Sequence, residues 1–154
     1  MATRIVLKVG NVYCLEIEGT CKYFLQYVGD DKSQLNSNVI RVFKTRYPLA
    51  YVPNLDDIVN DEVMFYAHVI LKFGIQDGIW YKVGKHKDVG DLDIYFRLFG
   101  YRWYTWKIDG PFHFYDELSP EIEKYDLGWV FRYRDIVRKI TTGHYEGWLE
   151  FVKT

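Results

Sequence analysis

The fold class is decided near the amino terminus, by the stretch VYCLEIEGTCKYFLQYV over residues 12–28. Apolar and polar side chains alternate with a period of two on both sides of Gly19, which is typical of a β-hairpin. A loop over residues 18–20 keeps the apolar side chains on one face, whereas a loop shorter by one residue divides them between both faces. The pattern therefore predicts these cross-strand pairs: Tyr13 with Leu25, Leu15 with Tyr23, Glu16 with Lys22, and Ile17 with Cys21.

The two cysteines of the chain both lie in this hairpin. The predicted register places Cys14 and Cys21 on opposite faces, so that their Cβ atoms point apart and a disulfide would require backbone movement. We therefore predict two free thiols.

Runs rich in β-branched and aromatic residues continue along the chain and are bounded by glycine and proline. The run 63–73 is apolar at nearly every position, so periodicity does not separate helix from strand. Its composition and the following Gly74 favour a strand that is buried on both faces. Residues 118–125 are predicted to be irregular. The predicted strands are 12–17, 21–28, 39–47, 63–73, 75–83, 94–99, 101–108, 112–115, 128–133 and 145–152.

Two short helices are predicted, at about 54–61 and at 134–142. Asn54 suits the amino-terminal cap of the first, with Asp57 three residues later. The second has one apolar face and ends at Gly143, which suits a carboxyl-terminal cap.

These elements predict the fold class. The chain of 154 residues has the length of one domain, and we expect a single domain over residues 1–154. The class is mainly β (α+β): a strongly bent antiparallel sheet or a partly open barrel, with the two short helices beside it.

Composition narrows the function classes. The formal net charge of −1 argues against a nucleic-acid partner, because non-specific binding of nucleic acid needs a basic excess. No apolar run approaches the ~20 residues that span a bilayer, and the first residues do not resemble a secretion signal. We therefore expect a cytoplasmic protein with no membrane partner.

Candidate chemical groups are scattered. The four histidines have no metal-binding spacing, and His68, in an apolar run, is expected to be a hydrogen-bonded core residue rather than a catalytic base. The charged stretch 85–93 and the acidic residues of 56–62 are expected to be solvated. The sequence therefore predicts no catalytic residues, no metal site and no cofactor.

The aromatic stretch 101–108 is the candidate partner-binding site. Alternation predicts one face formed by Arg102, Tyr104, Trp106 and Ile108, directed to the core. The other face carries Tyr101, Trp103, Thr105 and Lys107, which we predict to bind a partner, because Trp and Tyr anchor many interfaces. Burial of both faces within the chain is the alternative.

Three segments together carry a family resemblance: 8–13 (KVGNVY), 23–28 (YFLQYV) and 136–145 (IVRKITTGHY), with 30–43 between them. The chain resembles immunity protein family twenty-six of bacterial polymorphic toxin systems. The resemblance implies a mostly β protein that binds and neutralises a cognate protein toxin and is not an enzyme. The alternatives are a small hydrolase, of the phosphotriesterase kind noted for some relatives, and a carbohydrate- or ligand-binding domain.

Overall fold

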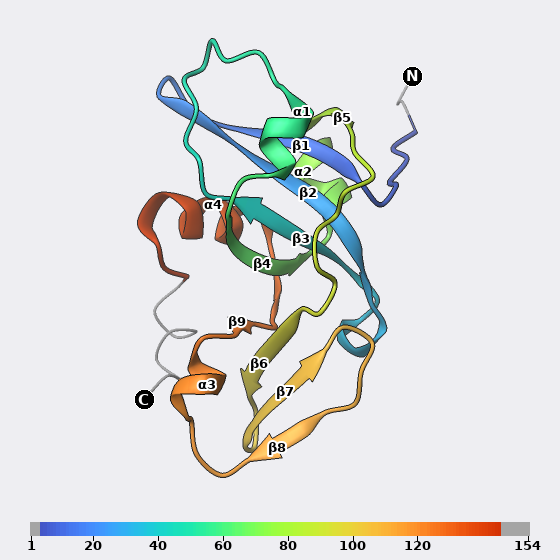
Figure 1. The fold of residues 1–154 in the computed structure, drawn as a ribbon, viewed down its shortest axis with the longest axis vertical. Coiled ribbons are helices and arrows are strands. Elements are labelled where there is room, and N and C mark those ends of the chain that lie inside the picture. The colour runs from blue at the N-terminus through green and yellow to red at the C-terminus, as the bar shows by residue number, and fades with distance from the viewer. Residues whose placement is uncertain (1–3, 146–154) are drawn as a thin grey trace.

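A computed structural model describes residues 4–145, which form two β-sheets placed end to end along the long axis (Figure 1). The six-stranded sheet has the order β10-β4-β3-β2-β1-β5, and the four-stranded sheet has the order β8-β7-β6-β9. The strands of the first are β1 Asn11–Ile17, β2 Cys21–Asp31, β3 Ser37–Phe43, β4 Val63–Val69, β5 Trp80–Lys85 and β10 Val130–Phe131. Those of the second are β6 Tyr95–Phe99, β7 Trp103–Lys107, β8 His113–Tyr115 and β9 Asp126–Leu127.

Four α-helices lie among these strands within residues 4–145: α1 Leu55–Val59, α2 Leu71–Gln76, α3 Pro120–Glu123 and α4 Tyr133–Thr142. A short 3-10 helix, η1 Lys32–Gln34, follows β2. None of the helices described is long and apolar enough to cross a membrane.

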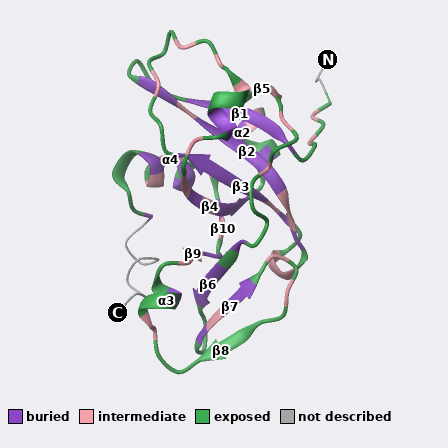
Figure 2. Cartoon of the chain, viewed as in Figure 1, coloured by how far each residue is buried: buried purple, intermediate pink, exposed green. Residues whose placement is uncertain are grey.

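The predicted hairpin is confirmed in position and in register. The pairs between β1 and β2 include Tyr13 with Leu25, Leu15 with Tyr23, and Ile17 with Cys21. Tyr13, Leu15 and Leu25 enter the main core, whereas Cys14 enters a second core on the opposite face, beneath α1. The β1–β2 hairpin is therefore buried on both faces, and Figure 2 shows these strands largely in the buried colour. Both cysteines are free thiols, as predicted.

Both predicted helices are also present. The Asn54 side chain accepts a hydrogen bond from the Asp57 amide at 3.2 Å and so caps α1. Helix α4 buries Ile136 and Ile140, and it ends at Gly143, whose φ of 81° is the left-handed conformation that glycine adopts readily.

The prediction of a strand over 63–73 is wrong beyond Val69, because α2 begins at Leu71. Gly74 does not end a strand; it lies within α2, where a Cβ atom would come within 2.2 Å of Cε2 of Trp80. The return strand accordingly starts at Trp80 rather than at residue 75. Side-chain packing, and not a turn, therefore explains this glycine.

The prediction of irregular structure over 118–125 is wrong as well. Ser119 caps α3 by accepting a hydrogen bond from the Ile122 amide, and Pro120 occupies the first helical turn. A serine followed by proline is a recognised start signal for a helix. Except for Tyr145, the predicted strand 145–152 lies outside the described residues.

The α+β class is confirmed, but the described residues form two sheets rather than one, and neither closes into a barrel. Each sheet also carries one parallel pair, β10 with β4 and β9 with β6, where a fully antiparallel sheet was expected.

Apolar packing joins the two sheets. Val28 and Val39 of the six-stranded sheet pack in one buried cluster with Phe96, Leu98 and Trp106 of the four-stranded sheet. In addition, the Tyr66 amide of β4 donates a hydrogen bond to the Asp126 carboxylate of β9 at 2.9 Å. Burial raises the pKa of Asp126 to about 6, and this hydrogen bond opposes part of the rise.

Candidate functional site

A buried polar centre lies where the two sheets meet. The Asp31 carboxylate, at the end of β2, accepts hydrogen bonds from Nε2 of His68 in β4 at 2.8 Å and from Nε1 of Trp106 in β7 at 2.7 Å. Its other oxygen accepts from the amides of Ser33 at 3.0 Å and Asp109 at 3.1 Å. One carboxylate therefore fixes three segments of the chain relative to one another.

The electrostatics of this centre favour an ionised Asp31. Burial raises the pKa of Asp31, but hydrogen bonds from His68, Trp106 and the Asp109 amide outweigh burial and lower it to about 2. His68 thus donates from Nε2, and its Nδ1 has no hydrogen-bond partner among the described residues. The expectation that His68 is a hydrogen-bonded core residue is confirmed.

The centre supports a surface corner, which we define as residues 32–36, which include the η1 turn, together with residues 109–111. The two parts are joined because the Lys32 amide donates to the Asp109 carboxylate at 2.6 Å. Among the described residues, the non-glycine residues with positive φ all lie here: Leu35 at 57°, Asn36 at 52° and Asp109 at 59°. Such strain persists only where the surrounding structure holds it, and it is common at binding sites.

Leu35 stands out within the corner. Its side chain is 87 % exposed, although a left-handed conformation costs a leucine roughly 1–2 kcal/mol. The fold therefore presents an apolar side chain to solvent on a strained backbone, with no packing gain inside the chain to offset the cost.

The predicted partner-binding face of β7 is mostly buried. Trp103 is 6 % exposed and Thr105 is 3 % exposed, and the Trp103 ring packs against Phe99 and the Arg97 guanidinium. Tyr101 and Lys107 are exposed, and Lys107 is paired with Asp93. The expectation that Trp103 and Thr105 contribute an exposed surface is wrong. Trp103 packs against the Phe99 and Arg97 side chains of the neighbouring strand β6, and Thr105 lies opposite Arg97 in the register.

The opposite face carries the exposed aromatic rings. Tyr104 is half-buried, and it packs against Phe112 at 5.3 Å and against Phe114 at 5.7 Å between ring centroids. Phe112 is 43 % exposed and Phe114 is 57 % exposed. We name Tyr104, Phe112 and Phe114 the aromatic surface. Alternation along β7 assigned Tyr104, Trp106 and Ile108 correctly to the face that packs in the core, although Arg102 is exposed. At Trp103 and Thr105 the alternative holds, since these residues are buried as well.

Strand β8 forms an edge of the four-stranded sheet within the described residues, and all of its residues are exposed. The outward backbone groups of an edge strand can pair with an added strand. Phe114 lies on this strand, so backbone pairing and aromatic contact are available at the same place. The exposed colour of β8 in Figure 2 contrasts with the neighbouring β6 and β7.

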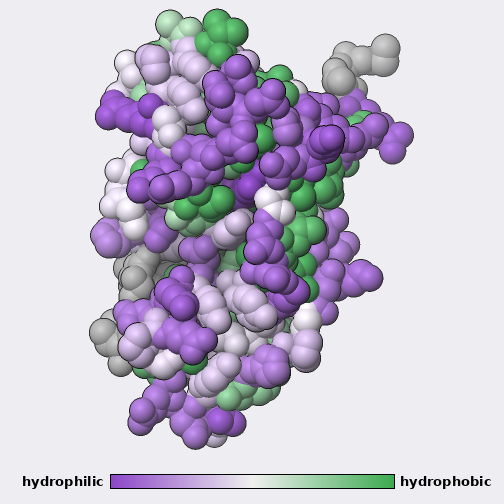
Figure 3. Space-filling view, viewed as in Figure 1, coloured by the Kyte–Doolittle hydropathy of each residue, from purple (hydrophilic) through white to green (hydrophobic). Residues whose placement is uncertain are grey.

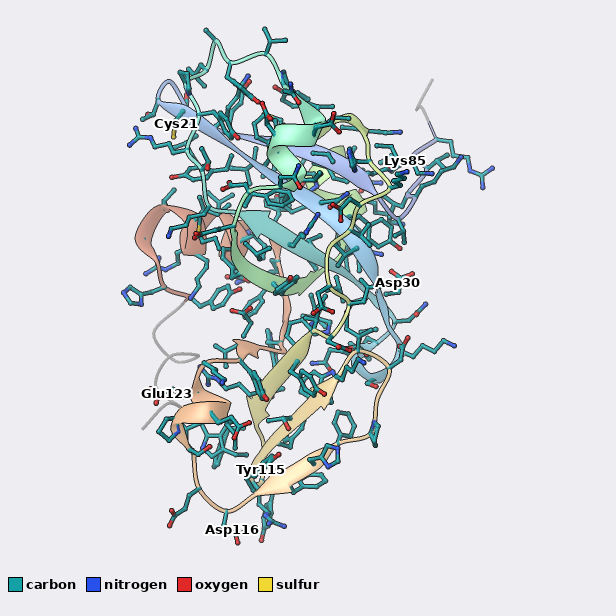
Figure 4. All side chains as sticks on the ribbon, viewed as in Figure 1. Cys21, Asp30, Lys85, Tyr115, Asp116 and Glu123 are labelled. Carbon is teal, nitrogen blue, oxygen red and sulfur yellow. The ribbon has the colours of Figure 1, made fainter. Side chains whose placement is uncertain are left out.

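An acidic rim borders this end of the molecule. Asp116, beside Tyr115 at the end of β8, lies at the lower tip in Figure 4, whereas Glu123 in α3 lies higher, on the left side. Glu117 and Glu121 are exposed in the same connection, and Arg102 pairs with Asp116 at 2.8 Å. In Figure 3 the surface over the four-stranded sheet is largely pale, with strongly hydrophilic side chains at its lower tip.

The remaining candidate groups are not gathered into one site. Among the described residues, no group of three His, Cys, Asp or Glu side chains is placed to hold a metal ion. His86 donates from Nε2 to Asp56 at 2.7 Å, and its Nδ1 accepts from the Asp88 amide at 3.0 Å. This pair joins the charged stretch 85–93 to α1 at the molecular surface.

Comparison with known proteins yields no matching family model, no matching curated protein and no matching solved structure.

Proposed function

We propose that this protein is a non-enzymatic protein-binding module that neutralises a cognate bacterial protein toxin. The observation that supports this proposal most directly is the aromatic surface, where Phe112 and Phe114 are about half exposed on an edge of the sheet. The resemblance to immunity protein family twenty-six is the reason for naming a toxin as the partner.

Energetics favour a protein partner at the aromatic surface. Removing an exposed phenylalanine from water contributes up to roughly 1.5–3 kcal/mol, and aromatic anchors lose little rotamer freedom on binding. Asp116 and Glu117 of the acidic rim directly follow β8, and Asp116 is paired with Arg102. A toxin with a basic rim around an apolar centre would therefore match this surface, and its association rate would fall with added salt.

The test compares three tagged proteins expressed in the native cell: the wild type, a Phe112→Ser/Phe114→Ser double variant, and a Tyr81→Ala control. Tyr81 is 47 % exposed in β5 of the other sheet, so the control removes an aromatic ring of similar exposure outside the aromatic surface. We expect one protein to be captured by the wild type and the control but not by the double variant.

That protein is then purified, titrated calorimetrically and expressed alone. We expect toxicity when it is expressed alone, and suppression of the toxicity by co-expression with the wild type but not with the double variant. Equal capture by all three proteins, or a captured protein that is harmless, would contradict the proposal.

Sugar rings also pack on exposed aromatic rings, so a carbohydrate ligand is the competing proposal for the same surface. A glycan that binds the wild type and fails to bind the Phe112→Ser/Phe114→Ser variant, in the absence of any protein partner, would favour this alternative.

A further inference from the structure

A pocket of about 360 Å³ lies on the six-stranded sheet, where β4 and β10 end. These two strands run parallel, and each leads into a helix: β4 into α2, and β10 into α4. The carboxyl ends of parallel strands are a frequent location for ligands in sheets covered by helices. The pocket does not include any residue of the aromatic surface or of the corner.

The pocket floor is apolar. Val69 and Val130 come from the strand ends, and Ile70 and Phe73 come from the start of α2. Ile70 is 42 % exposed and Phe73 is 46 % exposed, so this floor is open to solvent. Its size falls within the range of small-molecule sites, which begins at roughly 300 Å³.

The rim of the pocket carries two cations, Arg132 and Arg134. Arg132 lies 3.5 Å from the Asp135 carboxylate through Nε, and its side chain remains 67 % exposed, so other guanidinium donors are available. Arg134 is exposed and forms no ion pair with any described residue.

The acidic residue of the lining, Asp77, is already engaged. The Tyr133 hydroxyl donates to its carboxylate at 2.7 Å, and this hydrogen bond raises the pKa of Tyr133. The lining therefore carries two guanidinium groups and one carboxylate, and the carboxylate has part of its hydrogen-bonding capacity used by Tyr133.

We propose that this pocket binds a small amphipathic carboxylate, with an apolar chain on the Phe73 and Val130 floor and the carboxylate between Arg132 and Arg134. Guanidinium groups recognise carboxylates through paired, charge-assisted hydrogen bonds, and the apolar floor would contact the apolar chain of the ligand. The proposal is independent of the toxin-binding proposal, because the two sites share no residue.

The test is calorimetric titration of the full chain with decanoate, below the concentration at which decanoate forms micelles. Acetate supplies the head without the tail, and decyltrimethylammonium supplies the tail with the opposite charge. We expect saturable binding of decanoate at one site, and at least about tenfold weaker binding of both other probes, because neither combines the two features.

Variants locate the site. Arg132→Gln/Arg134→Gln should weaken decanoate binding about tenfold or more, and Ile70→Trp should block the pocket. Arg46→Gln removes an exposed arginine outside the pocket lining and should leave binding unchanged. Melting curves of all variants check that each remains folded.

Three outcomes would overturn the proposal: no saturable binding of decanoate, equal binding of decyltrimethylammonium, or binding that survives in both pocket variants. Tighter binding of a short leucine-terminated peptide than of decanoate, lost when the peptide carboxylate is amidated, would assign the pocket to a protein terminus instead.

Discussion

Nε2 of His68 lies 2.8 Å from the Asp31 carboxylate, and neither side chain has any exposed surface. His68 belongs to β4 and Asp31 ends β2, while the same carboxylate binds Trp106 of the four-stranded sheet. A buried polar contact thus holds the junction between the sheets, and removing one partner would leave the other buried without compensation.

The first prediction concerns acid stability. Asp31 has a folded-state pKa of about 2, below the ordinary value of 3.8, so its contribution is complete above pH 4 and is lost as the pH falls towards 2. Asp31→Asn should lower the free energy of unfolding by roughly 2–4 kcal/mol at neutral pH. Between pH 4 and 2 the difference between wild type and variant should shrink by on the order of 2 kcal/mol.

Urea unfolding of both proteins from pH 7 to pH 2 measures this difference. Asp116→Asn is the matched control, because Asp116 is an exposed carboxylate at the surface. A constant difference between wild type and Asp31→Asn across the acid range would show that the carboxylate is not held ionised by its partners.

The second prediction separates the two faces of β7. Trp103→Ala should lower the free energy of unfolding by roughly 3–5 kcal/mol, because it empties a buried ring site beside Phe99. Tyr101→Ala, at a 99 % exposed position, should change stability by less than about 0.5 kcal/mol. Chemical denaturation measures the free energy of unfolding of both variants. If Trp103→Ala were as stable as the wild type, Trp103 would again be a candidate for binding a partner.

The hairpin and β7 show what the alternation of apolar and polar residues can predict and what it cannot. In β1 and β2 the alternation fixed the register, because only one loop length keeps the apolar side chains of both strands together. In β7 the alternation again separated two faces correctly. It could not show that side chains of β6 pack over Trp103, nor that Phe112 and Phe114 remain exposed to solvent.

The candidate site depends on contacts of long range. Asp31, His68 and Trp106 are separated by dozens of residues, and none belongs to a local motif. His68 was predictable as a buried residue from its apolar neighbours, but its partner was not. The start of α3 could have been predicted from the sequence, since serine followed by proline, here Ser119 and Pro120, is a recognised signal for the start of a helix.

The third prediction concerns Gly74. Alanine normally stabilises a helix relative to glycine by roughly 1 kcal/mol. In α2, however, the added Cβ would lie within 2.2 Å of the Trp80 ring, whose Nε1 is tied to the Leu71 carbonyl at 3.1 Å. Gly74→Ala should therefore lower the free energy of unfolding by roughly 1–3 kcal/mol.

Gly29→Ala is the control for Gly74→Ala. Gly29 lies in β2, and a Cβ atom there would meet nothing within 4 Å, so its replacement should not reduce stability. If Gly74→Ala proved as stable as the wild type, the Trp80 ring would have to move readily, and the packing explanation of this glycine would fail.

The last prediction concerns Leu35, whose exposed side chain and φ of 57° oppose each other energetically. Leu35→Gly removes the left-handed strain and loses almost no packing, while glycine adds entropy to the unfolded chain. The net result should be an unfolding free energy higher by roughly 0.5 kcal/mol. Val52→Gly is the control: Val52 is 81 % exposed without a positive φ, so the same loss of a side chain should lower stability.

Measuring the affinity for the partner tests whether the left-handed backbone at Leu35 has a role in binding. If the corner belongs to the proposed binding surface, Leu35→Gly should be more stable and yet bind the proposed partner at least about tenfold more weakly, since an exposed leucine buried at an interface contributes on the order of 1.5 kcal/mol. Unchanged affinity in Leu35→Gly, together with lost affinity in Phe112→Ser/Phe114→Ser, would confine the interface to the aromatic surface. In that case the left-handed turn would serve only to connect η1 to β3, and the exposure of Leu35 would have no binding role.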